Sequence, residues 1–389
     1  MKGGKEWIGG TEYIKNIIFA LNSLPTELQS TFEITLIARN SPEELSLYDQ
    51  VISKVSNIYG QYTDLAPRSI LERGRWKLQR ILSPNDDDRR IQEFCERKKF
   101  SFVYPIFSNR REKFISAAWI PDFQYKYLPH LFPKEEVLSL HNTFKDSARY
   151  ASTVILSSKN AELDFKKFFP DSKAQTKVLS FATYPHKEWF ESDPKLIQKK
   201  YDLPDRFFIV SNQFWVHKNH VLIFKALKIL QRQNIRPIVV CTGNLHDHRC
   251  PEFADEILQT INKLDITQQI YLLGFIPRFD QIQLMRQAIA VIQPSLFEGW
   301  STVVEDARCL GKPMILSDIP VHLEQNPLNS VYFERNSAEA LALELANIWE
   351  HFSGTVNFDQ ESIARKNNLK AVQLLGLRFL EIAQSTQSI

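Results

Sequence analysis

The second half of the chain alternates short apolar runs with longer amphipathic segments. Runs with the length and composition of buried strands occur at 207–210, 237–243, 270–274, 290–294 and 313–317. Between them, segments around 221–230 and 281–287 carry apolar positions at helical spacing, and another helix is predicted to begin near Thr302 or Val303. Fully apolar strands that alternate with helices indicate a parallel sheet covered on both faces.

The first half shows the same rhythm less clearly. Residues 11–21 have helical spacing, with Thr11 as the predicted N-cap. Residues 32–38 and 154–158 predict strands, and the charged stretch 84–99 predicts a solvated loop or a surface helix. Two such halves imply two doubly wound domains that face each other.

The linker between the halves is predicted at Val178–Pro185, where a short strand ends. We therefore expect an N-terminal Rossmann-like domain over residues 1–182 and a C-terminal one over residues 183–369. The net charge is +5 in the first part and −2 in the remainder. A solvated surface explains this difference as well as an anionic acceptor or a membrane face does.

Composition narrows the class of protein. The 389 residues are 43% hydrophobic and 24% charged, as in ordinary globular proteins, and a net charge of +3 excludes a dedicated nucleic-acid binder. No apolar stretch is long enough to span a bilayer, and residues 1–6 lack the apolar core of a signal peptide. The cysteines predict reduced thiols and neither a disulfide scaffold nor a zinc site; they are Cys95, Cys241, Cys250 and Cys309. These features predict a soluble cytoplasmic protein.

The most informative stretch is Gln293–Ala307, where a predicted strand ends and a helix begins. Open α/β sheets bind ligands at this end of their strands, beside helix N-termini. The backbone amides suited to a phosphate there are those of Ser301, Thr302 and Val303. The carboxylates that sugar hydroxyls can donate to are those of Glu298, Glu305 and Asp306. An acidic first turn also occurs in helices without any function, because the helix dipole favours it.

This stretch resembles the Glu-x7-Glu segment of the retaining family-4 glycosyltransferases, which have the two-domain GT-B architecture. The following residues, Gly311–Pro320, match the continuation of that family's pattern. The resemblance places Glu298 at the first acidic position and Asp306 at the second, with Glu305 one residue earlier, and leaves open which of these two holds the ribose. It also implies donor contacts from Gly299 and Trp300.

A second constellation, Ser211–His220, resembles the family's G-R-L-x-x-x-K-G loop, whose Arg and Lys contact the donor diphosphate. Lys218 stands at the position of the Lys, but Gln213 stands where the Arg is expected. Gln213 donates hydrogen bonds without carrying charge, so a weaker or redistributed grip on the diphosphate is expected. His217 and His220 are interpreted as surface residues.

Three shorter segments extend the resemblance. Gly9 and Gly10 resemble the family's N-terminal glycine loop, where the backbone approaches the phosphate or the acceptor; only eight residues precede Gly9, so the first strand of the fold is expected to be missing. Asp122 and Tyr125 fall in a predicted acceptor-side loop, with Tyr125 where related enzymes often have a His. Phe275 falls in a segment resembling the loop whose backbone reads the nucleobase.

The resemblance implies an α/β protein of the GT-B class, with a cleft between two Rossmann-like domains. The last helix, about 370–389, is expected to pack back on the N-terminal domain. The implied reaction transfers a hexosyl unit with retention from a nucleotide-sugar, with UDP-glucose as the favoured donor. The implied acceptor is a polysaccharide or lipid-linked glycan in envelope or exopolysaccharide synthesis, with peripheral membrane contact left open. No metal or cofactor is expected, because Lys218 and helix N-termini would neutralise the diphosphate.

Two other classes of function remain open at the level of sequence. A catalytically silent sugar-nucleotide-binding protein would fit the expected lack of a first strand, Gln213 and Tyr125. A GT-B UDP-sugar epimerase would share the fold but carry its catalytic residues elsewhere.

Overall fold

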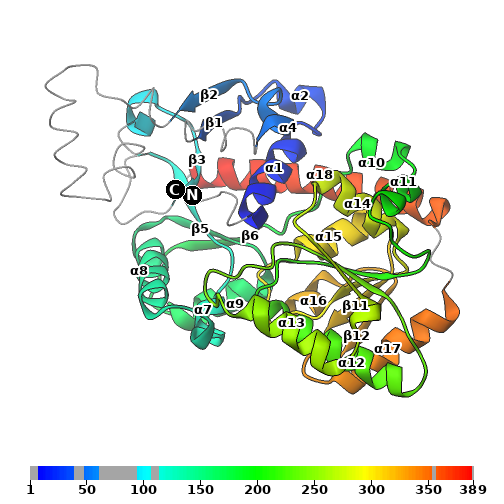
Figure 1. Ribbon diagram of the computed structural model, residues 1–389. Coiled ribbons are helices and arrows are strands. Elements are labelled where there is room, and N and C mark those ends of the chain that lie inside the picture. The colour runs from blue at the N-terminus through cyan, green and yellow to red at the C-terminus, as the bar shows by residue number, and fades with distance from the viewer. Residues whose placement is uncertain (1–7, 39–47, 61–93, 107–113, 353–355, 388–389) are drawn as a thin grey trace, which may run out of the picture.

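The computed structural model describes residues 8–38, 48–60, 94–106, 114–352 and 356–387 (Figure 1). All paired strands are parallel, and they form sheets of six, four and two strands. We call the part that holds β1–β6 the N-terminal half and the part that holds β7–β12 the C-terminal half.

The six-stranded sheet forms the core of the C-terminal half, in the order β12-β11-β10-β7-β8-β9. Its strands are β7 (Phe208–Ser211), β8 (Val239–Thr242), β9 (Ile270–Gly274), β10 (Val291–Gln293), β11 (Met314–Ser317) and β12 (Ser330–Phe333). Every residue of β7, β8, β10 and β11 is buried, as in a parallel sheet covered on both faces. All five strands predicted here are present, and β12 was not predicted.

Helices and 3-10 turns alternate with these strands, as the apolar spacing predicts. They are α10 (Lys187–Glu191), α11 (Pro194–Lys200), η2 (Val216–Lys218), α12 (His220–Arg232), α13 (Phe253–Leu264), η3 (Thr267–Gln269), α14 (Arg278–Gln287), α15 (Thr302–Cys309), α16 (Pro320–Gln325) and α17 (Ala338–His351). The strand order reverses between β7 and β10, which are hydrogen-bonded neighbours. Doubly wound sheets bind their ligands at such a switch point, outside the carboxyl ends of the strands.

The N-terminal half contains a four-stranded and a two-stranded parallel sheet. The first has the order β3-β4-β5-β6, with strands β3 (Val103–Ile106), β4 (Ser116–Ile120), β5 (Thr153–Leu156) and β6 (Gln175–Val178). The second consists of β1 (Thr35–Ala38) and β2 (Asn57–Gly60). The helices and the 3-10 turn of this half are α1 (Ile8–Leu21), α2 (Thr26–Gln29), α4 (Asp49–Ile52), α7 (Gln124–Tyr127), η1 (Pro129–Leu131), α8 (Lys134–Tyr150) and α9 (Lys159–Phe168).

Helix α1 packs on the four-stranded sheet and on helix α4. Tyr13 stacks on Trp119 of β4 with ring centroids 4.1 Å apart, and Ile18 and Phe19 pack in one cluster with Val51 of α4. The strand predicted at 32–38 is present in shortened form as β1, and the strand predicted at 154–158 is present as β5. Of the predicted charged stretch, residues 84–93 lie outside the described residues, and residues 94–98 are helical.

The start of α1 corrects two predictions. The helix begins at Ile8, so Gly9 and Gly10 lie in its first turn and do not form a loop. Thr11 is buried inside the helix and its hydroxyl has no hydrogen-bond partner among the described residues, so it is not the N-cap. Helix-forming residues that pack on a sheet here outweighed the low helix propensity of two glycines. The expectation that no strand precedes Gly9 concerns residues 1–7, which lie outside the described part of the chain.

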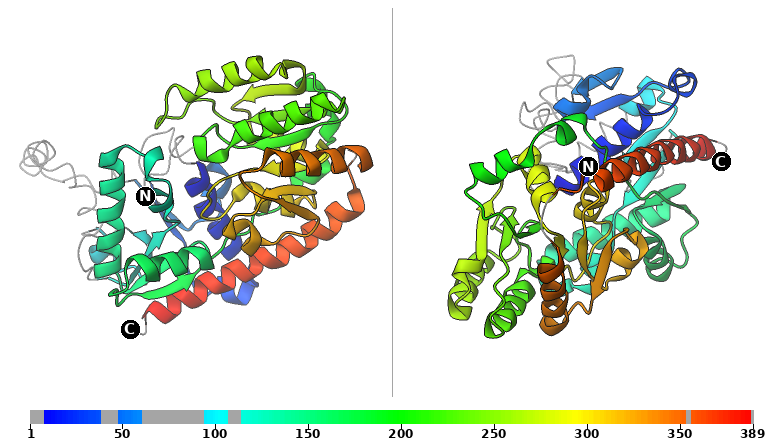
Figure 2. Two further views of the ribbon diagram at one scale, coloured as in Figure 1. Left: turned by 90° about the horizontal axis from the view of Figure 1, so that it is seen from below. Right: turned by 90° about the vertical axis from the view of Figure 1, so that its right-hand side faces the viewer.

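Helix α18 (Phe358–Gln387) runs from the C-terminal half back along α1 (Figures 1 and 2). Its first turns are attached by Glu361, which pairs with the fully buried Arg286 of α14 through two hydrogen bonds of 2.5 and 2.9 Å. Further along, Gly376 lies directly on the backbone of α1. Of the predicted segment 370–389, residues 370–387 are thus the later part of a longer helix, and residues 388 and 389 lie outside the described residues.

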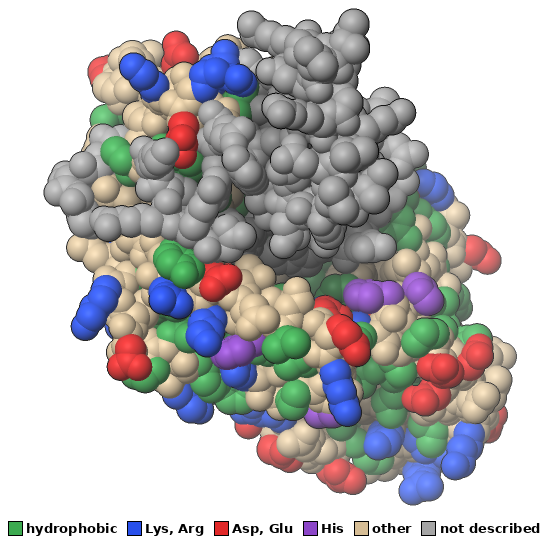
Figure 3. Space-filling view, turned by 90° about the vertical axis from the view of Figure 1, so that its left-hand side faces the viewer, with side chains coloured by type: hydrophobic (Ala, Val, Ile, Leu, Met, Phe, Trp, Pro, Cys, Tyr) green, Lys and Arg blue, Asp and Glu red, His purple; other side chains and the backbone are tan. Residues whose placement is uncertain are grey.

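The outer surface shows no dominant kind of side chain on the face drawn in Figure 3. Basic, acidic and hydrophobic side chains of the described residues alternate there. Among the described residues, no helix combines the length and apolar character that crossing a membrane requires.

The contact between α18 and α1 makes a testable prediction. A Cβ at Gly376 would lie 2.6 Å from the carbonyl oxygen of Ala20. Gly376→Val should therefore lower the free energy of unfolding by about 1–3 kcal/mol, measured by urea titration. Leu374→Val, on the same helix at a side chain 60% exposed, is the matched control. Equal effects of the two substitutions would contradict the close packing.

Candidate active site

A cleft of about 1610 Å³ lies between the two halves, and the carboxyl ends of the central strands of the C-terminal half open into it. Most of the site residues predicted from sequence line this cleft; they are Gly9, Asp122, Tyr125, Gln213, Lys218, Phe275, Glu298, Gly299, Trp300, Ser301, Thr302, Val303 and Asp306. Gly10 and Glu305 do not line it. The fold thus gathers residues that lie far apart in the sequence.

The centre of the site is an ion pair across the switch point. Lys218, at the end of η2, donates from Nζ to Oε1 of Glu298 over 2.6 Å, and the two side chains are only 15% and 9% exposed. Ser295 and Gln293 also donate to Oε1, over 2.6 and 2.9 Å. Among the described residues no hydrogen bond ends on Oε2 of Glu298, so this oxygen is available to a ligand.

Sequence reasoning missed three buried polar residues behind the ion pair, Asn212, Gln293 and Ser295. Asn212 and Gln293 exchange hydrogen bonds of 2.7 and 3.3 Å, and Gln293 also donates to Ser295 and Ser301 over 3.2 Å. All four residues are buried. The signal in the sequence was a Gln at the end of an otherwise apolar strand, because a buried amide needs partners and so marks a polar network.

The charges of this network are set by burial and by the neighbouring groups. Burial by itself would raise the pKa of Glu298, but the charge of Lys218, with smaller effects from His322 and His217, lowers it to about 2. Burial lowers the pKa of His217 to about 3 and that of His322 to about 4. Glu298 is therefore ionised and both histidines are neutral at pH 7.

His217 and His220 correct the prediction of surface histidines. His217 is 6% exposed and His220 is fully buried. The ring of His220 stacks on Phe214 with centroids 4.0 Å apart. The reason is that the turn between β7 and α12 folds inward over the sheet, so that polar residues at the helix start face the protein interior.

Asp306 and Glu305, the two candidates for the second acidic position of the resembled segment, have different surroundings. Asp306 lines the cleft but is buried, and it accepts two hydrogen bonds from Arg278 at 2.6 and 2.7 Å and one from Thr183 at 2.8 Å. Glu305 accepts from Gln325 at 2.9 Å, and burial raises its pKa. Of the two, only Asp306 adjoins the cleft.

On the opposite wall, the loop after β4 meets the Glu298 loop. A Cβ on Gly299 would lie 2.7 Å from the carbonyl oxygen of Pro121 and 2.9 Å from Oδ2 of Asp122, so only glycine fits. Burial, together with the negative charge of Glu298, raises the pKa of Asp122. The hydroxyl of Tyr125 lies 3.3 Å from Nδ1 of His141.

The remaining predicted residues differ in their freedom to meet a ligand. The backbone N–H of Ser301 already donates to Gln325 over 3.3 Å, which corrects the expectation of a free amide. Thr302 and Val303 occupy the first positions of α15, where amides have no acceptor within the helix. Trp300 donates to the carbonyl oxygen of Phe181 over 3.0 Å, and Phe275 is 70% exposed.

Metal-binding groups do not gather in the part of the chain that the structure describes. No cluster of three or more His, Cys, Asp or Glu side chains able to hold a metal ion occurs there. Within the same part, Cys95, Cys241 and Cys309 are buried free thiols and Cys250 is half-buried.

The lowered pKa of Glu298 makes the stability of the protein depend on pH. The ionised carboxylate stabilises the folded state above its ordinary pKa of 4.5, and this contribution is lost as the pH falls toward 2. A shift of that size corresponds to about 3 kcal/mol. In urea titrations, the cost of Glu298→Gln should be largest at pH 6–7 and should shrink below pH 4.5. Glu350→Gln, at an exposed position, is the control, and a cost that does not change with pH would contradict the assignment.

Comparison with known proteins agrees with this architecture. The family model described as "Glycosyl transferases group 1" matches residues 193–354. The O-antigen chain mannosyltransferase RfbU of Salmonella typhimurium is 23% identical over 181 residues, which are 46% of this chain. The match spans 48% of that relative, about half of its length.

Solved structures extend the likeness to the whole chain. Anabaena HepE, in complex with UDP and glucose, has a TM-score of 0.71 and 15% identity over 98% of both chains. Sucrose-phosphate synthase from Thermosynechococcus elongatus has a TM-score of 0.58 and 15% identity, over 97% of this chain and 92% of that one. The chain therefore has the GT-B fold, and its residues 193–354 are similar to the glycosyl transferases group 1 family.

Proposed function

We propose that this protein is a retaining glycosyltransferase that moves a hexosyl unit from a nucleotide-sugar to a glycan acceptor. The observation that carries the proposal is the buried Lys218–Glu298 pair at the switch point of the six-stranded sheet. It combines a cation for the diphosphate with an ionised carboxylate for the sugar, at the place where doubly wound sheets bind ligands.

The donor would lie along the loops of the C-terminal half. Lys218 uses one N–H on Glu298 and has two more for a phosphate oxygen. The first amides of α15 add partial positive charge on the same wall. The free Oε2 of Glu298 would accept a hydrogen bond from the donor sugar and stabilise positive charge at its ring. With this charge supplied by the protein, we propose that transfer needs neither a metal nor a cofactor.

Retention would follow if the acceptor hydroxyl attacks the face from which the diphosphate leaves, with a phosphate oxygen taking the proton. Asp122 and Tyr125, on the opposite wall, would orient the acceptor. The boundary between the two domains would lie between residues 182 and 183. The first domain would bind the acceptor and the second would bind the donor.

The relatives support the choice of substrates. HepE was crystallised with UDP and glucose and with UDP-glucose, and RfbU is an O-antigen chain mannosyltransferase. We therefore propose a UDP-hexose, UDP-glucose first, as donor, and a polysaccharide or lipid-linked glycan of the envelope as acceptor. The reaction would take place in the cytoplasm, with peripheral membrane contact where the acceptor is lipid-linked.

The role of Glu298 is tested by turnover. Glu298→Ala should lower the rate of UDP release from UDP-glucose by about 10²–10³-fold, because stabilisation of developing charge is lost. The assay contains EDTA and a lipid-linked glycan extract as acceptor. Glu350→Ala, at an exposed position, is the control. Turnover of Glu298→Ala at the wild-type rate would refute the role.

The role of Lys218 is tested by binding. Lys218→Ala should lower the affinity for UDP roughly 10–100-fold in calorimetry and leave the affinity for uridine unchanged, because only UDP presents phosphate oxygens. Lys225→Ala, at an exposed position on α12, should change neither affinity. An equal loss for UDP and uridine would indicate misfolding and not a lost phosphate contact.

The same assays separate the other classes of function. A silent sugar-nucleotide-binding protein would bind UDP-glucose without releasing UDP when acceptor is present. An epimerase would instead exchange hydrogen at C2 of the donor sugar.

A further inference from the structure

The cations that line the cleft are few among the described residues: Lys218, Arg249 and Arg278. Arg278 is held by both oxygens of Asp306, and Lys218 is paired with Glu298. Each of these pairs is neutral as a unit, and His217 is uncharged at pH 7 because burial lowers its pKa to about 3. A diphosphate would therefore meet little net positive charge from these groups, and position 213 contributes none.

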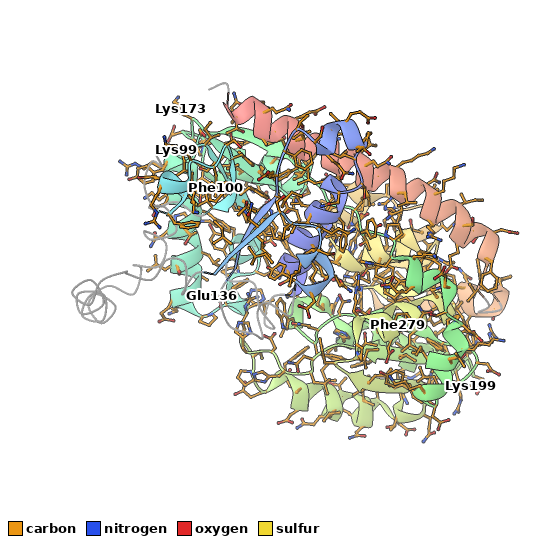
Figure 4. The ribbon with its side chains drawn as sticks, turned by 90° about the horizontal axis from the view of Figure 1, so that it is seen from above. Lys99, Phe100, Glu136, Lys173, Lys199 and Phe279 are labelled. Carbon is orange, nitrogen blue, oxygen red and sulfur yellow. The ribbon has the colours of Figure 1, made fainter. Side chains whose placement is uncertain are left out.

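Arg249 is the cation with the weakest hold on its partner. It donates from one terminal nitrogen to Oε1 of Glu136 over 3.1 Å. Glu136 lies on the first turn of α8, in the N-terminal half (Figure 4). Glu136 is 30% exposed, so solvent screens this pair. The Nε of Arg249 is buried and has no hydrogen-bond partner among the described residues. A buried donor of this kind is satisfied when a ligand oxygen arrives.

The loop that carries Arg249 is attached directly to the loop that carries Gln213 and Lys218. Phe214 donates its backbone N–H to the carbonyl oxygen of Asn244 over 2.9 Å. Buried Asp247 accepts from the backbone N–H of Val216 at 3.4 Å and of Arg249 at 2.9 Å. Gly243 has φ +126°, and a Cβ there would lie 2.1 Å from the carbonyl oxygen of Asn212. A side chain placed on either loop is therefore held at a fixed position relative to the other.

The guanidinium group also lies close to the centre of the site. It sits over Phe132 and Trp215, 4.0 and 5.2 Å from the two ring centroids, which fix its plane. Burial raises the pKa of Asp122, and the charges of Arg249 and Lys218 both oppose this rise; burial lowers the pKa of His217, and the same two charges add to this lowering. Both cations thus act on one region of the cleft.

We propose that Arg249 supplies the diphosphate-binding charge that Gln213 lacks, and that Glu136 occupies its anion site until the donor binds. This rests on the proposed function, since it names a donor-binding residue of the same site. The positive charge that would bind the diphosphate then stands on the loop after β8 and not at position 213 on the loop after β7. Donor binding then exchanges one anion for another on Arg249 and releases Glu136.

The test compares substitutions at both ends of the cross-cleft pair, with UDP and uridine as probes in calorimetry. Arg249→Gln should lower the affinity for UDP about 10-fold or more and leave the affinity for uridine unchanged. Glu136→Gln should strengthen UDP binding several-fold, because it removes the competing carboxylate. Adding Gln213→Arg to Arg249→Gln should restore much of the lost affinity. Arg232→Gln, at an exposed position on α12, is the matched control, and thermal unfolding checks that each variant folds.

The signs of the effects decide the outcome. If Arg249→Gln and Glu136→Gln weaken UDP equally, the pair only bridges the two halves and the proposal is wrong. UDP binding by Arg249→Gln at wild-type strength would also overturn it, while Lys218→Ala still tests the proposed function. A wild-type chain that binds neither UDP nor GDP would overturn the proposed function and this inference together.

Discussion

The arrangement of the two halves depends on one buried ion pair, Arg286 with Glu361. The guanidinium is fully buried, and besides Glu361 it donates to the carbonyl oxygens of Trp189 and Ser192 and to Gln283. A buried charge is tolerated only when its partners are complete. Helix α18 is thereby attached to the C-terminal half at its start, and its later turns lie on α1. One helix therefore packs on elements of both halves, α15 and α1, and helps to hold the two walls of the cleft in place.

Inside the cleft, every cation described here already has an anion, and ligand binding becomes an exchange of partners. The three ion pairs differ in the hydrogen bonds that form them. Two nitrogens of Arg278 bind the buried Asp306, and Lys218 binds a single oxygen of Glu298. Arg249 binds the partly exposed Glu136. Charge pairs are strongest where water is excluded. The two hydrogen bonds from Arg278 to Asp306 thus distinguish a structural pair from the two singly bonded pairs, which can open to a diphosphate.

The fold was predictable where burial leaves a local pattern. Strands β7 and β8 are buried on both faces, so they appear in the sequence as continuous apolar runs. Strand β12 lies at a sheet edge, mixes polar with apolar residues, and was not predicted. The beginning of α1 was misplaced because a Gly-Gly pair signals a turn locally, whereas tertiary packing of the helix on the four-stranded sheet and on α18 stabilises it.

The sequence by itself determined which side chains stand at the carboxyl ends of the strands, since the spacing of Lys218 and Glu298 from their strands is local. Only the tertiary structure decided which of them pair and which are charged. It buried His217 and His220, turned Asp306 toward Arg278, and set Arg249 opposite Glu136, 113 residues away. Protonation and pairing depend on dehydration and on charges from distant segments. No local pattern carries that information, because it arises only when segments that are distant in the sequence pack together.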